Sequence, residues 1–126
     1  MDNEMIAEFF DRFSIDFGQF DGRLIADRYF LPFMPVSASG VTQLLQDKND
    51  VAVYFQSYLD QYRNQGVTAC GYKDLQSFQI GECALIGIVT WLLTDADGGL
   101  RTSWRESYNL LRRADHLLVY SSADFG

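Results

Sequence analysis

Glu106 is the residue whose type and surroundings best fit acid–base chemistry. It lies in the run Trp104-Arg105-Glu106-Ser107-Tyr108, whose strand-like alternation places Glu106 on one face with Trp104 and Tyr108. Burial between two aromatic rings would raise the pKa of its carboxyl and suit it to donate or accept a proton. The competing interpretation is a core carboxylate paired with an arginine or a tyrosine hydroxyl, because buried charges are usually satisfied. Glu106 is the candidate catalytic residue, with a structural role as the alternative.

Three tyrosines on helical stripes, Tyr29, Tyr54 and Tyr58, are candidates for binding a ligand. Their hydroxyls could reach the mouth of a pocket while their rings pack on apolar neighbours. Tyrosines at helical spacing are also typical core residues with a hydrated tip, so both interpretations stay open.

Other familiar chemistries lack their residues in this sequence. The one histidine, His116, falls in a predicted hairpin turn, where a side chain is normally solvated. Cys70 and Cys83 are too few and too far apart for a zinc motif, and no histidine is placed to activate either thiol. Residues 95–99 (Asp-Ala-Asp-Gly-Gly) are too short for a calcium loop and lack the context of a phosphate cradle. We expect no metal site and no cofactor.

The elements that must position these residues begin with helices. Apolar residues recur at helical spacing up to Gly18, and a shorter helix is predicted between Asp21 and Pro32. Residues 33–45 predict a small hairpin or two edge strands. The clearest helix ends at Gly66 and carries the stripe Val51, Tyr54, Phe55, Tyr58, Leu59 and Tyr62.

The second half of the chain predicts a four-stranded antiparallel meander. Runs of strand-forming residues cover 67–78, 83–94, 100–113 and 117–122. Turn residues separate them, most clearly at 95–99. Helices followed by such a sheet predict an α+β layer fold, with the helices covering one sheet face.

Centring the hairpin on Asp97 sorts the strand residues by face, because it pairs Glu106 with Ile88 and Trp104 with Thr90. The predicted inner face then holds Ala84, Ile86, Ile88, Trp104, Glu106, Tyr108, Leu110, Leu117 and Val119. Three of these, Ile88, Trp104 and Tyr108, join the tyrosines as candidate ligand-binding residues.

The opposite face is predicted to be mixed rather than polar. It carries Val89, Trp91 and Leu93 beside Arg105. A face with this much apolar surface suggests a partner, most simply a second copy of the chain. Val89, Trp91, Leu93 and Arg105 are therefore the predicted dimer interface.

The overall charge limits the partners. Ten Lys and Arg residues stand against seventeen Asp and Glu, a net charge of −7, so a polyanion such as DNA would be repelled. No apolar run reaches the roughly 20 residues that a membrane span needs. The start, Met1-Asp2-Asn3-Glu4-Met5, lacks the basic region of a signal peptide. We expect one domain, 1–126, located in the cytoplasm, that binds neither nucleic acid nor membrane.

Two segments carry a resemblance to a known family. One is the short helix ending in Tyr29-Phe30-Leu31-Pro32, between the first helix and the edge hairpin, and the other runs from Trp104 to Asp124. In this element order the chain resembles the nuclear transport factor 2-like superfamily, and most of all its bacterial SnoaL-like members. The resemblance implies a cone-shaped barrel of cystatin-like topology, with N-terminal helices packed on a curved antiparallel sheet. It also implies an internal pocket and a dimer formed through the outer sheet face.

The resulting hypothesis is a dimeric domain whose aromatic-lined pocket binds a small apolar or aromatic molecule. One alternative is an isomerase, cyclase or lyase that acts on such a molecule with Glu106 as acid or base. Residues 33–40 contain no acid, which departs from the ketosteroid isomerases of the superfamily. The other alternative is an assembly module that acts through the outer sheet face.

Overall fold

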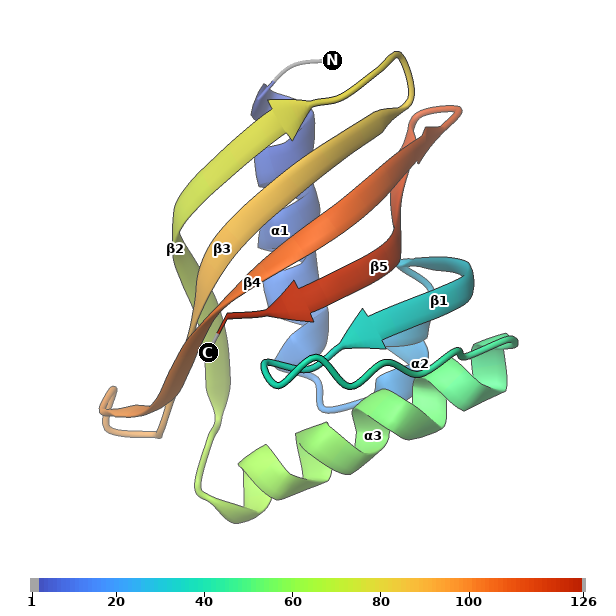
Figure 1. Ribbon diagram of the computed structural model, residues 1–126. Coiled ribbons are helices and arrows are strands. Elements are labelled where there is room, and N and C mark those ends of the chain that lie inside the picture. Colours follow the sequence, from blue (N-terminus) through green and yellow to red (C-terminus); the bar gives the residue numbers. More distant parts are fainter. Residues whose placement is uncertain (1–2, 126) are drawn as a thin grey trace.

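The computed structural model describes residues 3–125. They form, in order, α1 (Asn3–Phe17), α2 (Gly22–Ala26), β1 (Tyr29–Val36), α3 (Lys48–Asn64), β2 (Ala69–Gln79), β3 (Ala84–Thr94), β4 (Leu100–Arg113) and β5 (His116–Asp124), as Figure 1 shows. Within this part of the chain, no helix combines the length and apolar character needed to cross a membrane.

The two long helices form where their sequence patterns predict them. α1 stops immediately before Gly18, after an apolar stripe whose members are buried: Ile6, Phe9, Phe10, Phe13 and Phe17. α3 starts after Asp47, whose carboxylate accepts a hydrogen bond of 2.8 Å from the backbone amide of Asp50. It ends beside Gly66, whose φ of +90° suits a residue without a Cβ.

The short second helix ends earlier than predicted. α2 stops at Ala26, and Tyr29 and Phe30 already belong to β1. β1 runs parallel to β5, with Tyr29 opposite Val119. This strand pairing outweighs the helical spacing of Tyr29 and Phe30, so the helix ends before them. The segment after β1 turns back on it through isolated bridges, including Phe33 to Leu45, so the predicted edge hairpin is present.

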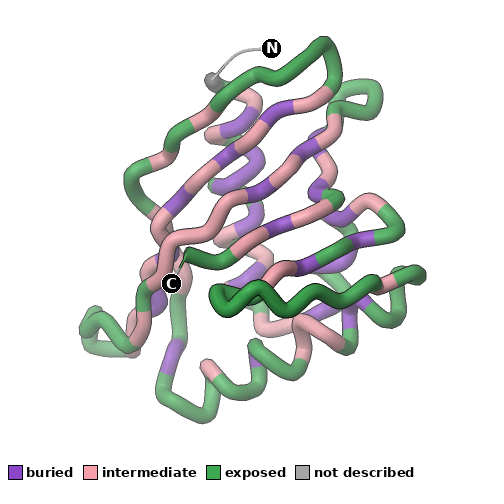
Figure 2. The backbone as a smooth tube through the Cα atoms, in the orientation of Figure 1, coloured by how far each residue is buried: buried purple, intermediate pink, exposed green. Residues whose placement is uncertain are grey.

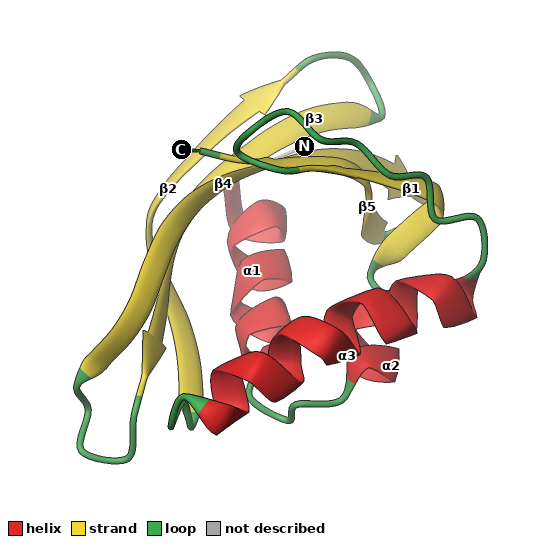
Figure 3. Cartoon of the chain, turned by 60° about the horizontal axis from the view of Figure 1, so that its bottom comes forward, coloured by secondary structure: helices red, strands yellow, loops and turns green. Residues whose placement is uncertain are grey.

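The sheet is curved and five-stranded, in the order β1-β5-β4-β3-β2. Because β1 is parallel to β5 while the other neighbours are antiparallel, the sheet is mixed rather than wholly antiparallel. Its two edges, β1 and β2, do not pair with each other, so the barrel is not closed. Figure 3 shows the helices on its concave side, which confirms the α+β prediction.

The predicted register between β3 and β4 is wrong by one residue. Thr94 lies opposite Leu100, as a hairpin centred on Asp97 requires, but the next pair is Leu93 with Thr102. Arg101 is therefore an extra residue in β4, a β-bulge that shifts every later pair. Trp91 faces Trp104, and Val89 faces Glu106.

This shift exchanges the two faces of β3 while leaving β4 as predicted. The buried residues of β3 are Leu85, Gly87, Val89, Trp91 and Leu93, in strict alternation with more exposed ones. Figure 2 shows the same alternation along the central strands. The inner face of β4 still carries Trp104, Glu106 and Tyr108, so the prediction fails for one strand only.

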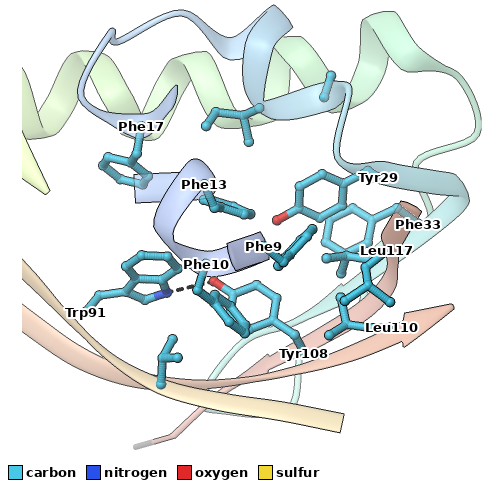
Figure 4. Packing of buried hydrophobic residues seen from close by; sticks show 14 of the residues in the cluster. Phe9, Phe10, Phe13, Phe17, Tyr29, Phe33, Trp91, Tyr108, Leu110 and Leu117 are labelled. Carbon is cyan, nitrogen blue, oxygen red and sulfur yellow. Dashed lines mark hydrogen bonds between the residues drawn. The ribbon is translucent and has the colours of Figure 1, made fainter. Parts of the chain in front are cut away.

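α1 fills one half of the concave face. Figure 4 shows the rings of Phe10 and Phe13 beside Trp91 and Tyr108, with ring-centroid separations of 5.3 to 6.0 Å. Gly87 makes this close approach possible, because a Cβ there would stand 2.9 Å from the Phe10 ring. Aromatic rings from α1 and the sheet thus form the contact between this helix and the central strands.

Candidate functional site

A cavity of about 300 Å³ lies under the sheet, between α3 and the C-terminal end of α1. Nine of its fifteen lining residues are aromatic, and two are acids. The lining consists of Phe13, Phe17, Pro35, Val36, Ser37, Tyr54, Phe55, Tyr58, Tyr62, Trp91, Trp104, Glu106, Tyr108, Ser122 and Asp124. The cavity therefore draws on both long helices, on β1 and the residue after it, and on strands β3 to β5.

α3 contributes one aromatic wall of the cavity. Tyr54, Tyr58 and Tyr62 recur every four residues, so their side chains lie on the same helix face. The Tyr54 and Tyr58 rings are 5.2 Å apart, and the Tyr62 ring stacks on Trp104 of β4 at 5.7 Å. Tyr58 keeps 42% of its surface exposed, which places it at the opening.

Glu106 lies on the opposite wall, held by its strand neighbours. Trp104 donates its indole N–H to the Glu106 Oε1 atom at 2.9 Å. The neighbouring Tyr108 hydroxyl accepts a hydrogen bond of 2.7 Å from the Trp91 indole N–H. Figure 4 shows this Trp91–Tyr108 bond inside the core. The carboxyl of Glu106 is thus oriented by the indole of Trp104 on its own strand.

Asp124 is brought to Glu106 by a second β-bulge. Leu110 lies opposite Val119, but Asn109 lies opposite Ser121, so Tyr120 is an extra residue in β5. After this shift Asp124 becomes the cross-strand partner of Glu106, and their carboxyl groups are hydrogen-bonded. Asp124 is exposed at the rim of the cavity, whereas Glu106 is half-buried inside it.

The environment raises the pKa of both carboxyl groups. Burial is the largest cause for Glu106, the negative charge of Asp124 comes next, and together they bring its pKa to about 8. The polar groups of Trp104 and Tyr108 next to Glu106 act in the opposite direction and lower its pKa. Burial also raises the pKa of Asp124, while its hydrogen bond with Glu106 lowers it. Near neutral pH the pair therefore shares one proton and carries one negative charge.

The surrounding tyrosine hydroxyls remain protonated at neutral pH. Burial is the main cause that raises the pKa of Tyr54 and of Tyr62, and the charge of Glu106 adds to it. The cavity therefore offers neutral hydroxyls and one shared carboxyl proton. Chemically, this arrangement can donate hydrogen bonds to a ligand, transfer a proton to or from it, or hold a positive charge.

The predicted site residues are distributed between cavity, core and outer face. Glu106, Tyr54, Tyr58, Trp104 and Tyr108 all line the cavity. Tyr29 instead packs in the core, with its ring 4.5 Å from Phe33. Ile88 lies on the outer face opposite Ser107, since the Arg101 bulge reverses its strand. Their roles in binding stay predictions.

The residues predicted to form the dimer interface are misplaced, with one exception. Val89, Trp91 and Leu93 are almost fully buried beneath the sheet, because the shifted register turns them inward. Only Arg105 lies on the outer face. Its guanidinium donates hydrogen bonds to the Asp74 carbonyl at 3.1 Å, to Thr90 Oγ1 at 3.0 Å and to Gln76 Oε1 at 2.9 Å.

Sequence reasoning missed several residues of the cavity. Tyr62 could have been found, because it continues the spacing of Tyr54 and Tyr58 by one more turn. Trp91 was assigned to the wrong face by the register error. Asp124 carries no local signal, since only the bulge at Tyr120 sets it opposite Glu106.

His116 is solvated and the two cysteines are reduced, as the sequence predicts. The His116 side chain is exposed at the β4–β5 turn, with its Nε2 atom 3.4 Å from a carboxylate oxygen of Asp115. Cys70 and Cys83 are unpaired with each other, and burial raises the pKa of the Cys70 thiol to about 12. Cys70 therefore stays a neutral thiol at neutral pH.

Comparisons with known proteins agree with this architecture. Aln2 from a Streptomyces species has a similar solved structure, with a TM-score of 0.78 and 12% identity over 99% of this chain and 92% of that one. An NTF2-like protein of unknown function from Shewanella oneidensis superposes with a TM-score of 0.75 and 10% identity, covering 100% of both chains. An NTF2-like protein with a cystatin-like fold from Novosphingobium aromaticivorans has a TM-score of 0.75 and 10% identity, over 98% of this chain and 80% of that one.

At these identities the likeness shows the fold alone, and no curated protein matches the chain. The model of a protein family, described as "NTF2-like protein (DUF6841)", matches residues 3–124. The superfamily predicted from the sequence is therefore confirmed, while the SnoaL-like subtype stays a prediction. The chain belongs to the NTF2-like family DUF6841.

Proposed function

We propose that the protein binds a small apolar or aromatic molecule in the cavity between α3 and the sheet. The observation that carries this proposal is an aromatic-walled space of about 300 Å³ that contains a hydrogen-bonded carboxyl pair. Ligand sites typically combine an apolar lining with a few convergent polar groups. A purely structural role for Glu106 and Asp124 would not require a cavity beside them.

The size of the cavity limits the ligand. An apolar cavity of about 150 Å³ is large enough for one benzene ring. About 300 Å³ therefore suits a single ring with a short side chain or a fused bicyclic molecule. Larger ligands would have to extend past Tyr58 and Asp124 at the rim.

A thermal-shift screen tests the proposal, because a ligand that binds only the folded state raises the melting temperature with its concentration. The panel holds one- and two-ring aromatics, polyketide-like aromatics, steroids and fatty acids. Binding should weaken in Tyr54→Ala, which removes a cavity ring, and should persist in Val53→Ala on the exposed side of the same helix. If no member of the panel raises the melting temperature, the binding proposal is wrong.

A second candidate function is acid–base catalysis by Glu106. The specific support is its position inside the cavity with a pKa raised to about 8, near the value suited to proton transfer at neutral pH. An isomerase, cyclase or lyase would use this carboxyl to protonate or deprotonate its substrate. If so, Glu106→Gln should abolish turnover of a ligand found in the screen and leave that ligand bound. Retained turnover in the variant would exclude Glu106 as the acid or base.

We also propose that the outer sheet face pairs with a second copy of the chain. Its apolar residues include Ile86, Ile88 and Leu92 of β3, Leu111 of β4 and Leu118 of β5. Ile88→Asp should then convert a dimer into a monomer in size-exclusion chromatography with light scattering, while Val53→Asp on α3 should not. A wild-type monomer at micromolar concentration would contradict this pairing. The cytoplasmic location stays a prediction.

A further inference from the structure

The charges around the cavity are of one sign. Glu106 and Asp124 line it, and none of the described lining residues is Lys, Arg or His. The titratable groups that interact with the Glu106 carboxyl come from several elements and are all acids or phenols: Asp124 of β5, Tyr54 and Tyr62 of α3, Tyr108 of β4 and Tyr29 of β1. A bound anion would therefore find no positive partner there, whereas a cation would find a negative one.

The aromatic walls strengthen this preference. Tyr54, Tyr58, Tyr62 and Trp104 form a continuous row of rings along the cavity, with neighbouring centroids 5.2 to 6.5 Å apart. The faces of such rings attract a cation that lies within about 6 Å of the ring centre, and tryptophan is the strongest of them. The row ends at Trp104, whose indole N–H is bonded to Glu106. Rings and carboxyls thus favour positive charge at the same place.

We propose that the ligand bound by this cavity is an amine: an ammonium group on an aromatic or apolar body of one or two rings. This inference rests on the proposed function and names its ligand class. The ammonium group lies at the Glu106–Asp124 pair, where it donates hydrogen bonds to both carboxyls. The apolar body lies between the α3 tyrosines and Trp104. The exposed position of Asp124 lets the charged group enter from the rim.

Binding of an amine has a consequence for the shared proton. The free pair holds one proton, as the pKa of about 8 for Glu106 implies. An ammonium ion beside both carboxyls favours their ionised forms, so the pair releases its proton to solvent as the ligand binds. The affinity for an amine therefore rises as the pH increases toward 8. A neutral ligand that accepts a hydrogen bond from the protonated pair would show the opposite dependence.

Four probes of matched shape test the proposal by isothermal titration calorimetry. They are 2-phenylethylamine (cationic), 2-phenylethanol (neutral), 4-phenyl-2-butanone (a neutral acceptor) and 3-phenylpropionate (anionic). At neutral pH the amine should bind about tenfold more tightly than the alcohol, since charge-assisted hydrogen bonds are about twice as strong as neutral ones. The anion should bind most weakly. Titration in two buffers of different ionisation enthalpy should show release of up to one proton with the amine only.

Matched variants assign the effect to the carboxyl pair. Glu106→Gln should abolish both the proton release and the preference for the amine over the alcohol. Asp124→Asn, at the exposed end of β5, should reduce that preference and serves as the second variant if Glu106→Gln does not fold. Glu82→Gln makes the same change of charge in an exposed turn and should leave the preference intact.

The outcomes separate this inference from the function on which it rests. If the alcohol or the ketone binds at least as tightly as the amine, the cavity takes neutral ligands, and only the amine proposal is overturned. If the amine preference survives in both Glu106→Gln and Asp124→Asn, the carboxyl pair is not its binding site and the proposal is wrong. If neither these probes nor the wider panel binds, the proposed function fails together with the inference.

Discussion

The two halves of the sheet's concave face are built from similar residues, but one half is packed and the other contains a cavity. In the half covered by α1, the ring of Phe10 is fully buried against the rings of Trp91 and Tyr108. In the half facing α3, rings of Tyr54 and Tyr58 face Trp104 and Glu106 across a cavity. Figure 3 shows both helices beneath the same curved sheet.

This comparison indicates that the distance of a helix from the sheet, rather than the number of its aromatic residues, decides whether its inner face packs in the core or leaves a cavity. α1 can approach the sheet because Gly87 leaves room for the Phe10 ring. α3 is instead anchored on α2, where Gly22 packs against the backbone of Ala52, and it crosses the open end of the sheet. The inner face of α3 also carries tyrosines, whose hydroxyl groups can hydrogen-bond to water in a cavity, whereas the phenylalanines of α1 cannot.

The largest expected effect is the loss of a ring from the filled half. Phe10 is fully buried, so Phe10→Ala should lower the free energy of unfolding by about 3–5 kcal/mol. Urea denaturation followed by circular dichroism measures it. A loss below about 1 kcal/mol would mean that the filled half is loosely packed, and the contrast between the two halves would disappear.

The next effect lies in the cavity half and depends on pH. The folded protein binds the Glu106 proton more tightly than the unfolded chain, because its pKa is raised to about 8 from an ordinary value of about 4.3. The contribution of Glu106 to the free energy of unfolding is therefore fully present below about pH 4 and is lost as the pH rises toward 8. Glu106→Gln removes that dependence.

The variant should gain stability relative to wild type by about 1 kcal/mol for each pH unit between these values. Thermal unfolding at several pH values measures the difference, with Glu82→Gln as the control for an exposed glutamate. A difference that does not change with pH would show that Glu106 is not held in a desolvated site.

A smaller effect tests the close approach of α1 to the sheet. Gly87→Ala would place a Cβ 2.8 Å from Ile6 Cδ1 and 2.9 Å from Phe10 Cε2, so it should cost about 1–3 kcal/mol of stability. Gly71→Ala on β2 is the matched control, since nothing lies within 4 Å of its added Cβ. Equal stability of the two variants would contradict the argument that Gly87 admits α1.

The smallest effect on stability is expected at the rim of the cavity. Tyr58 is 42% exposed, so Tyr58→Ala should change the free energy of unfolding by less than about 1 kcal/mol. The same variant should weaken ligand binding several-fold in calorimetry, because a wall of the cavity is removed. Unchanged affinity would place the ligand away from the α3 tyrosines.

Much of this fold was predictable because it depends on local pattern. The stripes of α1 and α3, the alternation of β4 and the inward position of Glu106 all follow from the helical and strand periods. The short helix before Pro32 was predicted too long, since the pairing of Tyr29 with Val119 is a contact between residues distant in sequence. Local propensity is a weak guide where such pairing competes with it.

The sequence by itself determined which residues could form an acid–base site, namely an acid between two aromatic rings on one strand face. The tertiary structure decided which other residues meet it. Arg101 and Tyr120 are β-bulges, and each shifts the pairing by one residue. The first turns Trp91 into the interior, and the second sets Asp124 opposite Glu106. A bulge depends on the twist and packing of neighbouring strands, so no local pattern in the sequence specifies it.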